Sequence, residues 1–200
     1  MGRFTQIPQN AFEALQLDAG VLLKNFDLEN GTFKNEDIIC ATTGGVNASC
    51  VAEYSDFAED VDNAPNNLME FKHLDGWECK IAATGLGASL ESIRLALGAA
   101  DIVQNRVVPR RTLKQSDFAD LYWAGDRADG GGAVIRLKNA LSTGGFSLQT
   151  GKNAKGQSAL EFTGHVSIKE QDVMPMEFYS LDPEPDSGGG QGPEENGEGA

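Results

Sequence analysis

The segment SALEFTGHVSI, residues 158–168, decides the fold that this sequence predicts. Its apolar side chains share one parity and its polar side chains share the other. That alternation is the period of a β-strand with one buried and one solvent-facing side. The apolar set is Leu160, Phe162, Val166 and Ile168, and the polar set is Glu161, Thr163, His165 and Ser167. We expect the apolar set to face a core.

Two further extended runs precede this segment. The run GFSLQT (145–150) leads into GKNAKGQ (151–157), a Gly/Asn-rich loop typical of hairpins, and AVIRLK (133–138) indicates a third strand. The sequence therefore predicts a long hairpin region over 131–168, with Phe146 and Leu148 adding to its apolar side. Arms of about ten residues would span about 33 Å. Because two-stranded ribbons are barely stable in water, such arms need other strands, from this chain or from another copy.

The remaining sequence indicates many strands and one helix. Residues 1–20 form an irregular N-terminal arm, and strands are expected at 21–23, 37–42, 46–57, 76–84, 118–124 and 174–179, with a break at 43–45. Ser89 is a suitable N-cap for a helix that ends at Gly98. Its apolar side carries Leu90, Ile93 and Leu97 and is widened by Ala96 and Ala100. The pattern predicts a mainly β protein with one central α-helix, an antiparallel β-sandwich or barrel-like domain over residues 1–181.

Charge and composition separate the last residues from this domain and exclude several classes of protein. The net charge is −14, and residues 182–200 hold six acids, no base and many Gly and Pro, which predicts a disordered acidic tail. The remaining 24 acids and 16 bases leave −8 without a basic stripe, which argues against nucleic-acid binding. A basic cluster flanked by acids indicates a solvated or subunit-facing surface; its members are Arg106, Arg110, Arg111 and Lys114.

Cysteine content and hydropathy point to the cytoplasm. The three cysteines, Cys40, Cys50 and Cys79, have no C-x-x-C spacing, which argues against a secreted disulfide framework and a zinc site. The first fifteen residues lack the apolar core of a signal peptide. No stretch approaches the ~20 apolar residues of a membrane span, so we expect no membrane association.

Residue patterns that carry chemistry are weak in this chain. An oxygen-rich loop lacks the EF-hand spacing and is better interpreted as a hydrated surface loop; its members are Glu59, Asp60, Asp62, Asn63, Asn66 and Asn67. The segment GLGASL (85–90) partly matches a dinucleotide-binding turn, but Leu90 replaces its third glycine. Neither His73 nor His165 accompanies a nucleophile motif. We expect no cofactor, no metal and no enzymatic activity.

Several segments, taken together and in order, resemble the major tail proteins, or tail tube proteins, of long-tailed, non-contractile bacteriophages and prophages of Gram-positive bacteria. The segments are QLDAGVLLK (16–24), YSD (54–56), EDVDNAPNN (59–67), LDGWEC (74–79), ALGAAD (96–101), NALSTGGFSLQ (139–149) and TGHVSI (163–168). The resemblance covers nearly all of residues 1–180, and the acidic tail is not part of it.

This resemblance implies a structural virion protein. Copies would form hexameric rings that stack into a tail tube, assembled in the host cytoplasm, and their long hairpins would close into one barrel around the bore. Double-stranded DNA would pass through without specific binding. The other partners would be the tape-measure, tail-completion (terminator) and tail-tip proteins. The polar set of 158–168 is a candidate for the bore or for solvent, and the 59–67 loop for contacts between subunits or rings.

Three alternatives remain open from the sequence. One is the tube subunit of a phage-like bacteriocin or gene-transfer particle. Another is a soluble β-sandwich binding module, for carbohydrate or adhesion, in which Trp77, Tyr122 and Trp123 form a stacking platform. A nucleotide-binding enzyme using Gly85–Ser89 is the third. Core packing of the aromatic residues is the plainer interpretation.

Overall fold

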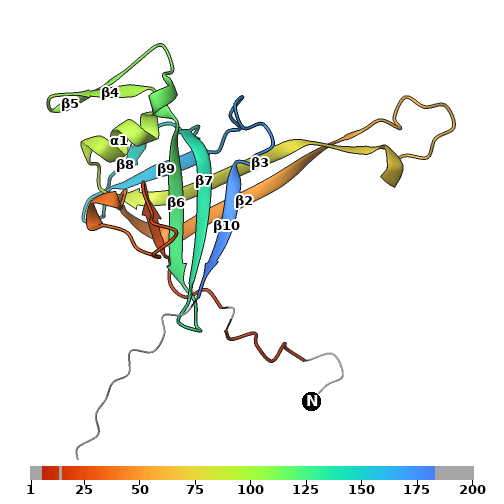
Figure 1. The fold of residues 1–200 in the computed structure, drawn as a ribbon. Helices are drawn as coiled ribbons and strands as arrows, with labels where there is room; N and C mark the ends of the chain where they lie inside the picture. The colour runs from red at the N-terminus through yellow and green to blue at the C-terminus, as the bar shows by residue number, and fades with distance from the viewer. Residues whose placement is uncertain (1–5, 14, 183–200) are drawn as a thin grey trace, which may run out of the picture.

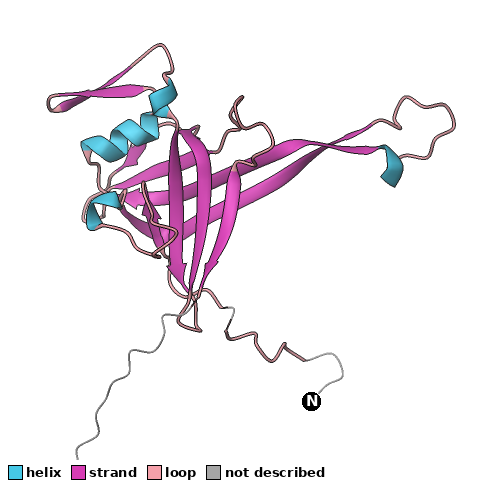
Figure 2. Ribbon diagram, in the orientation of Figure 1, coloured by secondary structure: helices cyan, strands magenta, loops and turns pink. Residues whose placement is uncertain are grey.

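Strand β7 (Gly132–Ser142) joins two antiparallel sheets in the computed structural model, which describes residues 6–13 and 15–182 (Figures 1 and 2). Its first half lies between β6 (Ala119–Asp126) and β10 (Met176–Leu181), and β1 (Val21–Leu23) pairs with β6. We call these four strands the body sheet.

The end of β7 crosses to a second sheet, which we call the arm sheet. There Leu141 and Ser142 pair with β9 (Gln157–Thr163). Beside β9 lie β3 (Lys72–Leu86) and then β2 (Ala41–Asp56), and the short β8 (Ser147–Gln149) pairs with the opposite side of β9. The mainly β, antiparallel fold class is therefore confirmed.

The main core fills the space between the two sheets. Leu121 and Leu137 from the body sheet belong to the same buried cluster as Ile81, Leu160 and Phe162 from the arm sheet. A second cluster covers the other side of the body sheet, beneath the segment that contains the short 3-10 turn Asn35–Asp37; its buried members are Leu23, Phe26, Tyr122 and Val134. Successive residues of a strand face opposite sides, which places the neighbours Leu121 and Tyr122 in different clusters.

Helix α1 (Leu90–Leu97) begins and ends where the sequence predicts. The Ser89 side chain accepts a hydrogen bond from the Ser92 amide at 3.1 Å, and Gly98 terminates the helix with φ of 69°. Its buried residues are Ser92 and Ala96. Of the predicted apolar side, Ala96 and Ala100 are therefore buried, whereas Leu90 is exposed. A two-stranded hairpin, β4 (Ala100–Val103) and β5 (Arg106–Pro109), follows the helix.

The longest hairpin of the described residues is β2–β3, which projects from the body (Figure 1). The predicted strands 37–42 and 46–57 largely merge into β2, whose 16 residues begin at Ala41. The predicted break is a β-bulge within this strand, because the register shifts between Thr43 and Val46 while Gly44 and Gly45 have φ of 75° and 83°. A short 3-10 turn, Met69–Phe71, precedes β3 at the tip.

The prediction of a long hairpin over 131–168 is wrong. Strand β8 has three residues, and β9 ends at Thr163. A Cβ on the buried Gly164 would lie 2.7 Å from Leu137 Cδ1 and 2.9 Å from the Pro175 carbonyl oxygen, so the chain makes a close approach there that only glycine fits. Residues 165–175, between β9 and β10, form a loop.

Two cysteines lie opposite each other on β2 and β3. Cys50 and Cys79 form a disulfide, whereas Cys40 is free. This single bridge joins the two strands of one hairpin. It differs from a framework of several disulfides, which the cysteine content argues against.

The predicted tail, 182–200, lies outside the described residues apart from Asp182. No helix of the described part of the chain combines the length and apolar character that crossing a lipid bilayer requires.

Candidate assembly surface

The β2–β3 hairpin leaves the body at the Cys50–Cys79 pair. Cys79 is fully buried in the main core, whereas Ala52 and Trp77, the next pair on the same side, lie beyond it. Strand β3 pairs with β9 only through Lys80–Leu86, so the two strands continue alone to Asp56 and Lys72. We call residues 50–79 the arm. Its strands extend about 20 Å, at ~3.3 Å per residue, before the tip loop of residues 57–71.

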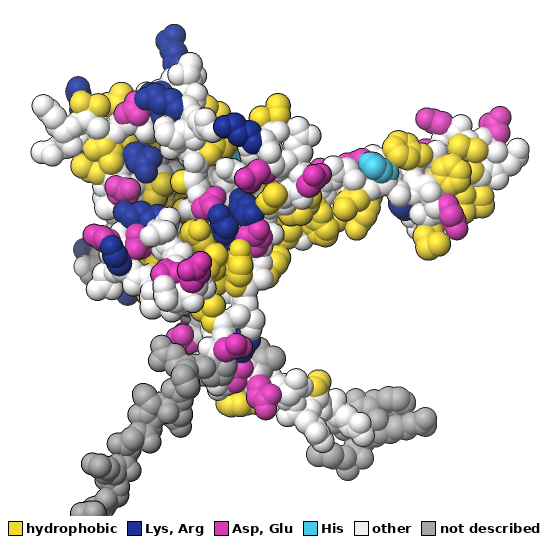
Figure 3. Space-filling model, viewed as in Figure 1, with side chains coloured by type: hydrophobic (Ala, Val, Ile, Leu, Met, Phe, Trp, Pro, Cys, Tyr) yellow, Lys and Arg dark blue, Asp and Glu magenta, His cyan; other side chains and the backbone are white. Residues whose placement is uncertain are grey.

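One side of the arm is apolar and is not covered by other described residues. The register places Ala52 opposite Trp77 and Tyr54 opposite Leu74, on the side that continues from Cys79. Tyr54, Leu74 and Trp77 are 62%, 44% and 37% exposed. These four residues are the apolar arm face, and hydrophobic side chains follow the arm to its tip in Figure 3. The tip adds exposed Phe57, Val61, Met69 and Phe71.

The opposite side of the arm sheet is mainly polar, although it also carries Val51 and Ala82. It runs from β2 across β3 to β9, and we call it the polar face: Asn47, Ser49, Glu53, Glu78, Lys80, Glu161 and Thr163. Its three acids and one base give a net charge of −2. Lys80 Nζ lies 2.5 Å from Glu78 Oε1, and the hydrogen bond between them raises the pKa of Lys80.

The arm sheet ends in an edge strand on each side, and each edge strand has one edge without a hydrogen-bonded neighbour among the described residues. Strand β2 is terminal in the strand order, and β8 pairs only with β9 among the described residues. Strand β3 also lacks a second partner over Lys72–Cys79. Unpaired backbone groups on a strand edge are a template for pairing with another chain. The two edges differ, so pairing one with the other between copies would be heterologous.

Asp56 organises the tip loop. Its carboxylate accepts hydrogen bonds from the amides of Ala58 at 3.0 Å and Asn67 at 3.1 Å, and it lies 3.2 Å from Lys72 Nζ. The hydrogen bond from Ala58, more than the contact with Lys72, lowers the pKa of Asp56 below its ordinary value. All the predicted loop residues lie exposed on this tip: Glu59, Asp60, Asp62, Asn63, Asn66 and Asn67.

The predicted apolar set is only partly buried. Leu160 and Phe162 are 2% exposed in the main core, and Phe146 packs partly buried against it. Leu148, Val166 and Ile168 are instead 46%, 49% and 84% exposed. The apolar alternation therefore marks a buried strand only as far as Phe162, because Gly164 turns the chain away.

The predicted polar set divides at the same point. Glu161 and Thr163 lie on the polar face. His165 and Ser167 belong to the loop after β9, which corrects their predicted place on a strand. His165 Nδ1 lies 3.1 Å from the Asn139 carbonyl oxygen, and its ring contacts Phe118 edge-on.

The sequence predicts both strands of the arm in part, as 46–57 and 76–84, but not their pairing into one hairpin. The shared parity of Cys50, Ala52 and Tyr54 was visible, as was that of Trp77, Cys79 and Ile81. Their pairing was hidden by the bulge at 44–45 and by a second register shift between Glu53 and Tyr54. One signal for the pairing is present in the sequence. Two apolar runs, each on a single parity, lie on either side of the polar loop at 59–67.

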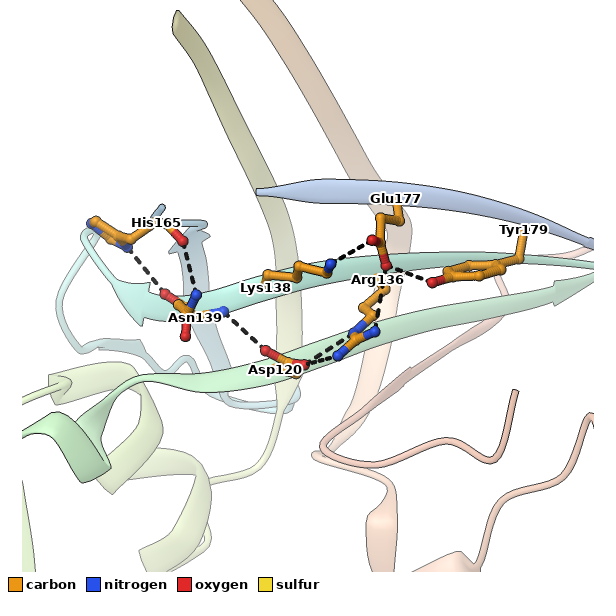
Figure 4. Close-up of polar contacts among 7 residues, drawn as sticks. All are labelled: Asp120, Arg136, Lys138, Asn139, His165, Glu177 and Tyr179. Carbon is orange, nitrogen blue, oxygen red and sulfur yellow. Dashed lines mark hydrogen bonds and ion pairs between the residues drawn. The ribbon is translucent and has the colours of Figure 1, made fainter. Parts of the chain in front are cut away.

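A network of charged side chains lies on the body sheet (Figure 4). Arg136 Nη2 lies 2.6 Å from Asp120 Oδ2, and Arg136 Nη1 lies 3.4 Å from Glu177 Oε2. Lys138 and Tyr179 also donate to Glu177. Burial alone would raise the pKa of Glu177, but these hydrogen bonds lower it below its ordinary value. Since the charges are paired across β6, β7 and β10, the network holds these strands together.

The alternative sites are not assembled. Tyr122 is buried in one cluster, whereas Trp123 packs against the other and donates from Nε1 to the Ala19 carbonyl oxygen at 3.0 Å. Trp77 lies on the arm, so the three aromatic residues form no common platform. The strand before α1 is antiparallel to both its neighbours, unlike a dinucleotide-binding βαβ unit. The described residues hold no cluster of three or more His, Cys, Asp or Glu suited to a metal.

The fold and the arm define an antiparallel β protein with an exposed apolar arm face. No family model matches the chain, and a sequence search of curated proteins finds no match. Two solved structures align over 74% of this chain and 92% of theirs. One is the virion of a native gene transfer agent (GTA) particle, with 13% identity and a TM-score of 0.41. The other is the tail of an empty GTA particle with C6 symmetry, with 11% identity and a TM-score of 0.37. With values this low, neither assigns a function to this chain.

Proposed function

We propose that this chain is a structural subunit that assembles with its own copies into the tail tube of a phage-like particle. The observation that carries the proposal is the arm, because its apolar face continues the core of the monomer yet has no cover. The resemblance of the sequence to phage tail tube proteins supports the same function.

The apolar arm face favours burial against another copy. Burying one large apolar side chain is worth about 1.5–3 kcal/mol, and Tyr54, Leu74 and Trp77 are all held on one side of the hairpin. Contiguous exposed apolar surface of this kind marks interaction sites in soluble proteins. A two-stranded ribbon is also marginal without further strands. A second copy supplies both the cover and the strand.

The two open edges of the arm sheet explain how assembly stops at a ring. When the β2 edge of one copy pairs with the β8 edge of the next, each added copy extends the combined sheet by one arm sheet, always in the same direction. Heterologous contacts of this type generate closed rings when the rotation closes, and closure leaves no edge. Six copies per ring is the number that the sequence resemblance implies.

The polar face is suited to the bore of such a tube. Its net charge of −2 repeats with every copy, so the lining repels the phosphate backbone of DNA. A basic lining would adhere to DNA and slow its passage. In this arrangement DNA travels through the tube without specific binding, and no catalytic group is required.

The remaining partners follow from the position of a tube within a particle. A tape-measure protein occupies the bore before DNA does, a terminator closes one end, and a tail-tip complex occupies the other. In this proposal the tube belongs to the tail of a long-tailed, non-contractile phage of a Gram-positive bacterium, and it is assembled in the host cytoplasm. A gene-transfer particle or phage-like bacteriocin would use the same tube geometry.

Removing the arm tests this function directly. Val51 and Glu78 are directly paired, so residues 52–77 can be replaced by an Asn-Gly turn that closes the shortened hairpin. We expect a folded monomer that forms no rings or tubes in negative-stain microscopy at concentrations where the intact protein assembles. Tubes formed without the arm would refute the proposal.

Single substitutions refine the test. Trp77→Glu places a charge on the apolar arm face, and Val51→Glu, the matched control, places it on the other side of the same hairpin. Trp77→Glu should leave the thermal unfolding of the monomer nearly unchanged and prevent assembly. Val51→Glu should assemble, and equal loss in both variants would contradict the assignment of the faces.

A further inference from the structure

Charge is distributed unequally between the two ends of the body. One end carries the N-terminal arm, the β6–β7 turn and the end of β10 (Figure 1). We call the described residues 6–13, 15–18, 126–131 and 180–182 the foot. Its charged residues are Glu13, Asp18, Asp126, Asp129 and Asp182, with Arg127 as its one base. Five acids and one base give the foot a net charge of −4. Its one base, Arg127, forms an ion pair with Asp129.

The opposite end is basic although the protein as a whole is acidic. We call residues 100–117, which include β4 and β5, the crown (Figure 1). Four bases and two acids give it a net charge of +2, and basic side chains gather at that end in Figure 3. Arg110 bridges both acids, Asp101 and Asp117. Arg106 and Arg111 are exposed and form no ion pair with the described residues.

Both ends also carry apolar side chains that are exposed in the part of the chain that the structure describes. On the foot these are Ile7, Phe12, Leu15 and Leu17, with Ile7 82% and Phe12 69% exposed. On the crown they are Ile102, Val103, Val108 and Leu113. The crown hairpin pairs with no other strand of the described residues, and isolated hairpins gain stability by packing. The two ends lie on opposite sides of the body, so they do not meet within one chain (Figure 1).

We propose that the crown of one copy binds the foot of a second copy, with Arg106 and Arg111 facing the acids of the foot. The contact is heterologous and propagates from copy to copy in one direction. Opposite charges set its orientation and speed encounter, while crown-to-crown and foot-to-foot approaches are repelled. This inference rests on the proposed self-assembly and identifies a second contact surface, separate from the arm.

Charge reversal on the full-length protein tests the contact. The crown variant is Arg106→Glu with Arg111→Glu, and the foot variant is Glu13→Lys with Asp126→Lys; all four side chains are exposed. The matched control, Lys152→Glu with Lys155→Glu, makes the same charge change as the crown variant, and a change of equal size to that of the foot variant, on an exposed loop elsewhere. Circular dichroism checks folding, and sedimentation velocity with negative-stain microscopy measures assembly against protein concentration.

We expect the crown and foot variants each to need at least about tenfold more protein than the control to assemble, because like charges then face each other. Combining all four substitutions should restore assembly. Assembly of the natural protein should weaken towards about 1 M salt, where the Debye length is about 3 Å. Variants that assemble like the control, or a combination that does not recover, would overturn this contact alone. A natural protein that never assembles would overturn the proposed function as well.

Discussion

At the scale of single residues, Phe162 and Ile168 show what the sequence predicts and what it does not. Both share the apolar parity of one alternating segment, yet Phe162 is 2% exposed and Ile168 is 84% exposed. The difference arises at Gly164, whose contacts with Leu137 and Pro175 depend on a segment distant in sequence. Parity predicts which side a residue faces while a strand lasts, but tertiary packing determines where the strand ends.

Substitution of these two residues by Asp gives a matched pair. Phe162→Asp puts an unpaired charge into the main core, and loss of the ring alone costs about 3–5 kcal/mol. We expect this variant not to fold in soluble form. Ile168→Asp should unfold at nearly the same temperature as the natural protein. Calorimetry or thermal circular dichroism checks both, and comparable destabilisation by the two substitutions would show that the segment remains a strand.

At the scale of elements, the sequence predicts most strands but not the pairing of β2 with β3 into the arm. The strands at 21–23, 76–84 and 118–124, and the helix between Ser89 and Gly98, follow directly from local pattern and capping. The β2–β3 hairpin depends on a pairing across the 15-residue tip loop, and its register is shifted twice. Local alternation does not encode such a pairing. It instead favours a long hairpin at 131–168, where the alternating segments are close together in the sequence.

The bulge at Gly44 and Gly45 should be required for the geometry of β2. Both residues have positive φ, a region that costs an L-residue roughly 1–2 kcal/mol each. We expect Gly44→Ala with Gly45→Ala to lower the melting temperature by about 2–4 °C for each kcal/mol lost, and to weaken assembly. Gly76→Ala is the control, because Gly76 lies in the same hairpin without positive φ or a neighbour within 4 Å of an added Cβ. Equal melting temperatures for the two variants would contradict a structural role for the bulge.

At the scale of the whole molecule, the centre of the body is internally satisfied, whereas the arm and the two ends of the body are not. The ion pairs that link β6, β7 and β10 and the two buried clusters complete the body within one chain. The apolar arm face, the open β2 edge and the two charged ends have no partner among the residues that the structure describes. A self-assembling tube subunit accounts for each of these features through contact with further copies.

Hydrogen exchange of the arm amides, compared between dilute monomer and assembled protein, tests the account most directly. Residues 50–79 should exchange readily in the monomer, because only one ladder of hydrogen bonds joins their strands, and should become strongly protected on assembly. Strands β6 and β7 should be protected equally in both states. Arm amides that are already fully protected in the monomer, or that remain unprotected in the assembled protein, would contradict the claim that other copies complete this hairpin.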